Sequence, residues 1–173
     1  MVATQARKGT KLKYTVFRTS MGWVGAIASP SGIRRLNLPV PTHQQALEEL
    51  GLDDLDAEFE PEYFAKLGHA VQMYLDGKVK QLMAPLDLEG APPFFLAVWR
   101  ACLTIPPGEK RSYAWLAEQA GNPRAVRAAG QAMARNPIAL IIPCHRVVGS
   151  SGDLTGYGGG LDMKAKLLAQ EAR

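Results

Sequence analysis

A thiol and an imidazole stand side by side in the stretch IIPCHRVV, residues 141–148, as Cys144 and His145. Cys144 could be a small core residue, a metal ligand, half of a disulfide or a nucleophile. Two cysteines are too few for a disulfide framework, and there is no CxxC pair. His43, His69 and His145 show no ligand spacing, so no metal site is expected.

A nucleophilic cysteine must lose its proton, because the thiolate is the reactive species. A free cysteine, with a pKa of about 8.5, is only a few per cent ionised at neutral pH, so a nucleophilic Cys144 is expected to have a lowered pKa. Pro143 cannot donate to a sheet, so the run ending in Cys144 is not a regular central strand. Cys144 and His145 could pair directly only if the backbone turns after Pro143, since neighbours on a strand face opposite ways. Otherwise water or a third group would relay the proton.

Taken alone, a buried apolar thiol is the simplest interpretation of either cysteine. Cys102 lies in FFLAVWRACLTI, residues 94–105, where a helix would place apolar side chains on one face: Phe95, Val98, Cys102 and Ile105. Cys102 is therefore predicted to be a core residue.

Two helices are expected before the Cys144 segment. Ser112 is a candidate N-cap for the first, which would end at Gly121. Asn122 would cap the second, with Pro123 at its first position. A connection of about two residues makes the pair a helix-turn-helix candidate.

The second of these helices, residues 123–136, divides into two faces. One is predicted to carry the long polar side chains of Arg124, Arg127, Gln131 and Arg135, with Ala128 and Ala134 between them. The opposite face would carry Val126, Ala129, Gly130 and Met133. A narrow cationic face could approach a nucleic-acid groove closely, although an ordinary amphipathic surface helix has the same pattern.

Charge is unevenly distributed along the chain. The net charge is +4, and residues 1–90 carry 10 Lys/Arg against 11 Asp/Glu, whereas residues 91–173 carry 10 against 5. This excess points weakly to a polyanionic partner. No apolar run approaches the roughly 20 residues of a membrane span, and the start lacks the apolar centre of a secretory signal. A cytoplasmic protein with no membrane association is expected.

The first ninety residues predict an α+β arrangement. Strands are expected at 14–20, 21–30 and 32–40, forming an antiparallel sheet, with one more strand at PLDLEG, 85–90. Helices are expected at 42–50, where Thr42 and Gln45 fit a capping box, and at 61–77, ending at Gly77. The acidic segment 53–62 is interpreted as an exposed connection. The segment EGAPP suggests a boundary, giving domains 1–90 and 91–173.

The stretches TIPPGEKRSYAWLAEQAGNPRAVRAAG and NPIALIIPCHRVVGSSGDLTGYGGG resemble the active-site domain of the O6-alkylguanine-DNA alkyltransferases, also called methylated-DNA protein-cysteine methyltransferases. The likeness is dense from Phe94 to Glu171. Residues 1–90 resemble the family's variable N-terminal domain only in size and element order. The resemblance implies a ribonuclease-H-like α/β domain followed by a mainly helical, winged-helix-like domain with a helix-turn-helix and the active site.

The resemblance also implies residue roles. Cys144 matches the nucleophile, His145 the base acting through water, and Glu171 the carboxylate that orients it; considered alone, Glu171 would be a solvated residue in a helix's last turn. Asn136 matches a hinge asparagine, and Tyr113 a residue that rotates the nucleotide. Arg127 matches the residue that replaces the extruded base in the DNA stack. The other implied DNA contacts are Tyr113, Asn122, Arg124, Gln131 and Ser150. The implied base pocket consists of Val147, Tyr157, Gly158 and Gly159.

The implied activity is the single-turnover transfer of an alkyl group from O6-alkylguanine in duplex DNA to Cys144 after base flipping, with O4-alkylthymine as a further candidate lesion. No metal or organic cofactor is implied. A monomer is expected, nucleoid-associated in a bacterium or archaeon, with cooperative contacts on DNA left open. The chain departs from the family's pattern at Phe95, often Gln, and at Gly158, Ser in some members. The alternatives are a non-enzymatic lesion sensor, disfavoured by Cys144, and a cysteine hydrolase.

Overall fold

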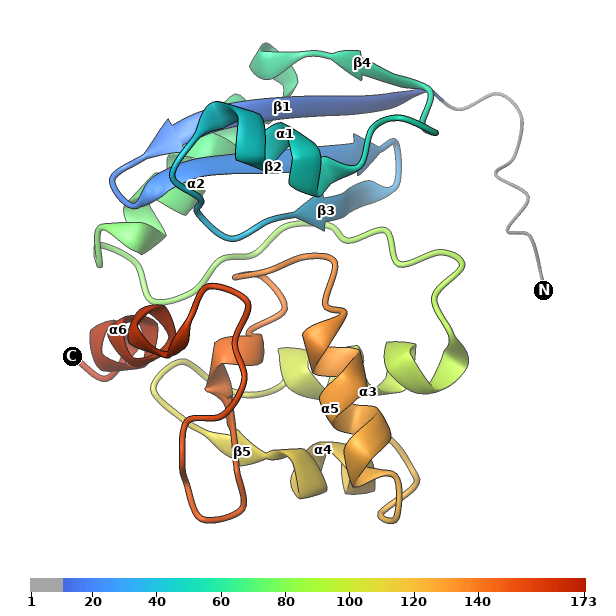
Figure 1. Ribbon diagram of the computed structural model, residues 1–173, viewed down its shortest axis with the longest axis vertical. Helices are drawn as coiled ribbons and strands as arrows, with labels where there is room; N and C mark the ends of the chain where they lie inside the picture. The colour runs from blue at the N-terminus through green and yellow to red at the C-terminus, as the bar shows by residue number, and fades with distance from the viewer. Residues whose placement is uncertain (1–10) are drawn as a thin grey trace.

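The computed structural model describes residues 11–173, so residues 1–10 of the predicted first domain lie outside the described part of the chain. The elements form two lobes, seen as the upper and lower parts of Figure 1. The upper lobe consists of four strands and the helical segments within residues 43–75. The lower lobe consists of the helices from residue 93 onwards, a short 3-10 turn and a two-stranded ribbon. The polypeptide crosses between them over residues 76–92.

The upper lobe is built on the three predicted strands, which form an antiparallel meander: β1 (Leu12–Thr19), β2 (Gly22–Ser29) and β3 (Gly32–Leu36). A fourth strand, β4 (Ala57–Phe59), pairs parallel to β1, giving the order β3-β2-β1-β4. The acidic segment 53–62 was therefore wrongly interpreted as a mere connection. Its short strand has only three residues, too few for alternation to reveal it.

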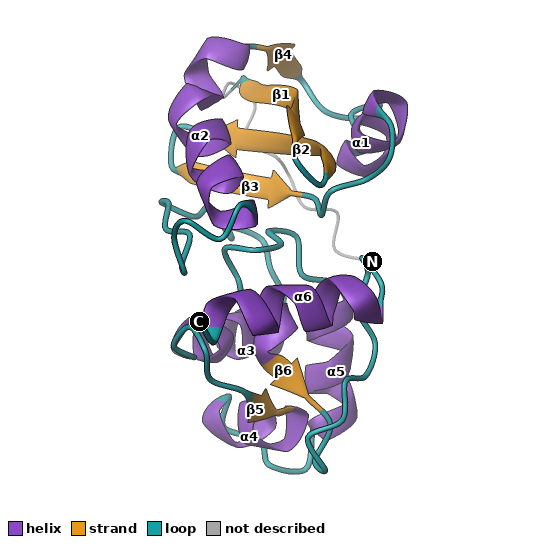
Figure 2. Cartoon of the chain, turned by 90° about the vertical axis from the view of Figure 1, so that its left-hand side faces the viewer, coloured by secondary structure: helices purple, strands orange, loops and turns teal. Residues whose placement is uncertain are grey.

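Helices cover both faces of this sheet, as Figure 2 shows. On one side α1 (His43–Leu50) begins with the predicted capping box, in which Thr42 and Gln45 bond reciprocally, and packs on Val16 and Ile27. On the other side η1 (Pro61–Phe64) leads into α2 (Ala65–Leu75), which packs against Val24 and its alternate neighbours on β2. Gly77, with φ of 73°, marks the predicted end of the second helix.

The segment 85–90 does not form the predicted strand. It makes a single bridge, between Leu86 and Ile33, with Ile33 N donating to Pro85 O and Asp87 N donating to Ile33 O. Pro85 has no N–H to extend the ladder. The carboxylate of buried Asp87 instead accepts a hydrogen bond from Ser29, which fixes the crossing segment against β2.

The lower lobe contains α3 (Pro93–Leu103), α4 (Tyr113–Gln119), α5 (Val126–Ala134), η2 (Cys144–Arg146) and α6 (Leu161–Glu171). A parallel ribbon joins β5 (Arg111–Ser112) to β6 (Val147–Val148). Ser112 caps α4 as predicted, accepting from Trp115 N. Cys102 is fully buried on α3, which confirms its predicted place in the core.

The connection between α4 and α5 is longer than predicted. Asn122 does not cap α5: its side chain accepts a hydrogen bond from Arg124 N inside a turn, and α5 begins at Val126. The two helices are therefore separated by residues 120–125 rather than by about two residues. Val126, predicted on the face opposite the arginines, is 38% exposed and is the first residue of α5.

Candidate active site

The segment between α5 and Cys144 is folded into tight turns. Leu140 has φ of 68°, a left-handed conformation that is rare for a residue with a side chain. Asn136 braces these turns: its Nδ2 donates to Ile142 O at 2.9 Å, and its Oδ1 accepts from Ile138 N at 3.0 Å. The backbone turns after Pro143, and Cys144 opens the 3-10 turn η2. As predicted, this segment is not a strand.

The upper lobe holds the same segment from the other side. Leu36 N donates to Pro137 O, and Ala139 N donates back to Leu36 O, both at 2.9 Å. These bonds form one parallel β-bridge, between Leu36 at the end of β3 and Ile138 at the start of the turns. The approach to Cys144 is thus fixed by backbone hydrogen bonds to a strand a hundred residues earlier.

Cys144 is partly exposed as a residue, whereas Cys102 is buried. Burial raises the pKa of Cys144 above its ordinary value; the hydrogen bond to Asn136 and the charge of Lys164 lower the pKa but do not offset the rise. The expectation of a lowered Cys144 pKa is therefore wrong for the resting protein. A raised pKa disfavours the thiolate, so attack by the sulfur calls for a base that takes the proton.

His145 and Glu171 form a buried pair beside this thiol. His145 Nε2 lies 2.7 Å from Glu171 Oε1, and both side chains have no exposed surface. Burial lowers the pKa of His145, although the hydrogen bond to Glu171 opposes this effect. Burial raises the pKa of Glu171, but hydrogen bonds from His145 and Arg146 outweigh it and hold that pKa at about 2. The resting pair is a neutral imidazole facing a carboxylate.

This pairing fixes the tautomer of the imidazole. An ionised carboxylate only accepts hydrogen bonds, so Nε2 must carry the ring proton. Nδ1 then holds the lone pair, and it is buried without a hydrogen-bond partner among residues 11–173. His145 therefore does not bond directly to the thiol. An unsatisfied basic nitrogen in this position can accept a proton that a water molecule relays.

Three residues around this pair were not singled out from the sequence. Arg146 is fully buried, and its Nε and Nη2 donate hydrogen bonds to the Glu171 carboxylate, each at 2.8 Å. Tyr74 of α2 donates to Glu171 Oε1 at 2.7 Å. Lys164 is buried on α6, where its Nζ donates to Thr155 O at 2.9 Å. Arg146 had one available signal, since it is a cation within the apolar run that surrounds Cys144, whereas Lys164 lies in a mostly exposed helix and had none.

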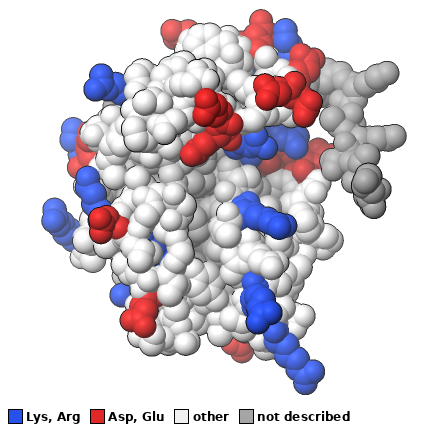
Figure 3. Space-filling view, viewed as in Figure 1, with Lys and Arg blue, Asp and Glu red and all other residues white. Residues whose placement is uncertain are grey.

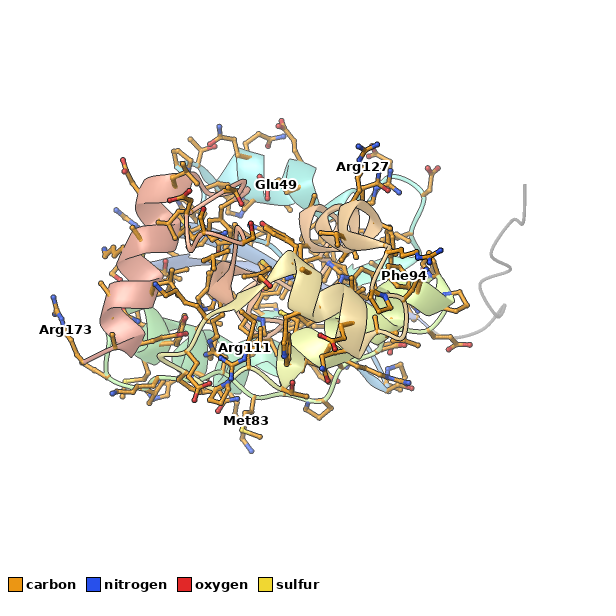
Figure 4. All side chains as sticks on the ribbon, turned by 90° about the horizontal axis from the view of Figure 1, so that it is seen from below. Glu49, Met83, Phe94, Arg111, Arg127 and Arg173 are labelled. Atoms are coloured by element: carbon orange, nitrogen blue, oxygen red, sulfur yellow. The ribbon has the colours of Figure 1, made fainter. Side chains whose placement is uncertain are left out.

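The polar face of α5 is exposed, as predicted. Arg127 projects from the helix into solvent in Figure 4, and its neighbours on this face are also exposed: Arg124, Gln131 and Arg135. Ala129 and Met133 are buried behind them. On the face shown in Figure 3, Lys and Arg side chains project over the surface that α5 forms, whereas Asp and Glu side chains gather on the upper lobe. This face is available to an anionic partner.

Tyr113 is linked to the segment that leads into the glycine-rich loop, residues 156–160. Tyr113 opens α4, and its hydroxyl donates to Thr155 O at 3.3 Å. Tyr157 has a buried hydroxyl with no partner among residues 11–173, and burial raises its pKa. Of the remaining predicted residues, Ser150 and Gly158 are exposed, Gly159 is partly exposed, and Val147 is fully buried in β6.

The sequence of this chain is similar to those of known proteins. The profile described as "6-O-methylguanine DNA methyltransferase, DNA binding domain" matches residues 93–173. A methylated-DNA–protein-cysteine methyltransferase of Methanosarcina acetivorans is 37% identical over 158 residues, which cover 91% of this chain and 97% of that protein. The chain belongs to the methylated-DNA–protein-cysteine methyltransferase family. A relative with this name from Mycolicibacterium paratuberculosis is 52% identical over 113 residues, covering 65% of this chain and 68% of the relative.

A solved structure of this family has the same mixed α+β fold. The Mycobacterium tuberculosis OGT in complex with DNA superposes with a TM-score of 0.76, at 36% identity over 92% of each chain. The family resemblance drawn from the motifs is thereby confirmed.

Phe95 and Gly158, at which the chain departs from the family's pattern, both have ordinary packing contacts. Phe95 packs edge-on against Trp99, with ring centroids 5.9 Å apart, and the guanidinium of Arg135 lies 5.9 Å from its ring. The aromatic ring therefore supports the end of α5. At Gly158 an added Cβ would meet Leu38 Cδ1 at 3.7 Å, an ordinary contact.

Two features of the chain concern partners rather than the reaction. Among residues 11–173, there is no cluster of three His, Cys, Asp or Glu side chains suited to holding a metal ion. In the same part of the chain, all helices are too short or too polar to cross a membrane.

Proposed function

We propose that this protein repairs DNA by transferring the alkyl group of O6-alkylguanine to Sγ of Cys144, once per molecule. The observation that carries the proposal is the buried Glu171–His145 pair, because the free Nδ1 of His145 belongs to the residue directly after Cys144. The relatives' shared name and the DNA complex of the Mycobacterium tuberculosis protein support the same conclusion.

The proposed reaction is a displacement at the alkyl carbon. The thiol proton passes through water to Nδ1 of His145, whose imidazolium is stabilised by Glu171. The sulfur lone pair forms the S–C bond as the C–O6 bond breaks, and guanine leaves with that electron pair. The proton then moves to the departing base, leaving neutral guanine and neutral His145. A thioether has no leaving group that water could replace readily, so Cys144 stays alkylated.

DNA would bind against the exposed face of α5. A lesion within the stack is inaccessible, so the damaged nucleotide must be flipped out at a cost of a few kcal/mol. Arg127 is proposed to occupy the vacated stack, and Tyr113 to crowd the phosphate of the rotated nucleotide. Phosphate contacts would come from Asn122, Arg124, Gln131 and Ser150. The flipped base would lie beside Cys144 against Tyr157, Gly158 and Gly159, with Val147 beneath; Asn136 would brace the turn behind it.

The division of the chain is part of the proposal. Residues 1–90 are proposed to be a ribonuclease-H-like domain, and residues 91–173 a winged-helix-like domain with the helix-turn-helix and the reactive cysteine. The α4–α5 pair, joined through residues 120–125, is consistent with the second assignment. A monomer is proposed as the active species, and O4-alkylthymine as a second substrate.

The decisive experiment follows the fate of one methyl group. The protein is incubated in excess with a duplex containing one O6-methylguanine, then digested and analysed by mass spectrometry. One added methyl is expected on the peptide that contains Cys144. Cys144→Ala should lose transfer but keep DNA binding, and Cys102→Ala, the matched loss of a buried thiol, should retain transfer.

Each alternative function predicts a different outcome of this experiment. Binding of the lesion without transfer by the wild-type protein would indicate a sensor. A methyl on another residue would reassign the nucleophile. Repeated turnover on an ester substrate, with the DNA lesion untouched, would indicate a cysteine hydrolase.

A further inference from the structure

The upper lobe contributes one polar side chain to the buried catalytic cluster. Tyr74 lies in the last turn of α2 with no exposed surface. Its Oη is 2.7 Å from Glu171 Oε1 and 3.1 Å from His145 Nε2. The residue therefore closes a triangle with the two side chains that the proposed reaction uses, although it is 71 residues from one and 97 from the other along the chain.

The contacts of Glu171 determine how this triangle is oriented. Oε1 accepts from Tyr74 Oη, His145 Nε2 and Arg146 Nη2, while Oε2 accepts from Arg146 Nε. Because the carboxylate can only accept, the phenol must donate to it, and the phenol oxygen is then left to face the Nε2 proton. The other tautomer would place the Nε2 lone pair against Oε1, 2.7 Å away. Tyr74 and Glu171 together thus favour a lone pair on Nδ1.

The attachment of α2 to α6 keeps Tyr74 in place. The backbone carbonyl of Tyr74 accepts a hydrogen bond from the Gln170 side chain, one residue before Glu171. Arg146 also reaches past Glu171 with Nη2 to Lys80 O, in the segment that follows α2. Tyr74 is therefore fixed through both its backbone and its phenol to the elements that carry the catalytic pair.

We propose that Tyr74 is a positioning residue for the alkyl transfer: it holds the Glu171–His145 pair in the tautomer and orientation in which Nδ1 receives the Cys144 proton. This inference depends on the proposed function for its chemistry. Both lobes then contribute side chains to the catalytic cluster. It also assigns a specific role to the upper lobe, which carries neither the thiol nor the cationic helix face.

Tyr74→Phe in the full chain tests this role. Phenylalanine fills the same volume, and Glu171 keeps its bonds from Arg146 and His145, so the fold should survive. Transfer from duplex O6-methylguanine is expected to slow by roughly 10-fold at neutral pH, because one hydrogen bond to a charged group is lost. DNA affinity, measured by fluorescence anisotropy, should not change.

The pH profile separates positioning from packing. The charged and titratable groups that face His145 are Glu171 and Lys164 on α6, Arg146 beside it, and Tyr74 on α2. Without the phenol, the Glu171 charge acts more strongly on the imidazole proton. The acid limb of the rate profile should therefore move to higher pH, by about half a unit. A packing role would lower thermal stability and leave this limb in place.

Tyr63→Phe is the matched control, since Tyr63 is exposed in η1 and belongs to the same lobe. It should match the wild type in rate and pH profile. Histidine side-chain ¹⁵N NMR gives a readout that needs no substrate. The wild type should show His145 protonated at Nε2, and Tyr74→Phe should show a changed tautomer ratio or a raised pKa.

The outcomes distinguish the two proposals. If the wild type transfers the methyl group, while Tyr74→Phe keeps the wild-type rate, acid limb and His145 spectrum, the role of Tyr74 is refuted and the proposed function stands. If the wild type transfers nothing, the proposed function fails, and the NMR comparison alone decides whether Tyr74 sets the tautomer.

Discussion

At the scale of single residues, burial disfavours the ionised form of the Cys144 thiol. Burial raises the pKa of Cys144, while His145 is neutral and has a free, buried Nδ1. A protonated thiol beside an unused base is protected from unwanted electrophiles until an alkyl carbon is correctly placed. Proton loss and S–C bond formation are then coupled at the moment of attack, rather than separated into two steps.

This state predicts weak reactivity towards a general alkylating reagent. At pH 7.5, iodoacetamide should label Cys144 more slowly than it labels a free cysteine peptide, because the thiolate fraction is smaller. The rate is measured by peptide mass spectrometry in Cys102→Ala, so that only one thiol is counted. Labelling faster than the peptide would mean that a thiolate exists before substrate binds, contrary to the pKa direction given above.

At the scale of elements, the sequence predicts what is periodic and misses what depends on a distant partner. The helix that carries Arg127 was predicted with its exposed face correct, because arginines and alanines repeat at helical spacing. The start of this helix was not predicted correctly. Asn122 and Pro123 have the signature of a helix start, but the chain makes a turn there, and α5 begins at Val126. Cap signatures identify where a chain can turn, and tertiary packing decides which residue becomes helical.

The cationic face of α5 carries the next prediction. Arg127→Ala should slow repair of duplex O6-methylguanine by at least about 10-fold, since a flipped nucleotide would lose the side chain that replaces it in the stack. Reaction with free O6-benzylguanine, which needs no flipping, should change less than about 2-fold. Single-turnover kinetics on both substrates measure the difference.

Arg18→Ala is the matched control for that comparison, because Arg18 is an exposed arginine on β1 in the upper lobe. It removes the same charge and should leave both rates unchanged. Equal losses on duplex and free base in Arg127→Ala would instead assign Arg127 to the chemistry or to the stability of α5.

At the scale of the whole molecule, one core joins the two lobes. Its buried members include Leu36 of β3, Tyr74 of α2 and Leu167 of α6, so the lobes share an apolar interior as well as hydrogen bonds. Motif resemblance implied roles for Cys144, His145 and Glu171, and the structure pairs His145 with Glu171. The resemblance did not point to Tyr74 and Arg146, because their contacts come from the convergence of α2, η2 and α6, which has no local signature. Tyr74 falls within the helix expected at 61–77, whose sequence pattern gives no sign of the polar contact.

The buried carboxylate at this convergence makes the stability of the whole molecule dependent on pH. The folded state holds the pKa of Glu171 at about 2, against an ordinary value of 4.5. A lowered pKa stabilises the fold above the ordinary value, and this contribution is lost as pH falls from 4.5 towards 2. His145 acts in the same direction from pH 6.5 downwards, because the unfolded state takes up its proton first.

Glu171→Gln should therefore change both the level and the slope of stability. At pH 7 it leaves the buried guanidinium of Arg146 without a counter-charge, so the free energy of unfolding should fall by about 3 kcal/mol or more. Below pH 4.5 the variant should lose stability less steeply than the wild type, because the titrating carboxylate is gone. Urea unfolding followed by tryptophan fluorescence at pH 7, 5.5, 4 and 3 measures both effects.

Glu118→Gln, at an exposed position on α4, should reproduce the wild-type curve. Parallel curves for wild type and Glu171→Gln would show that the acid sensitivity of the fold originates elsewhere in the chain.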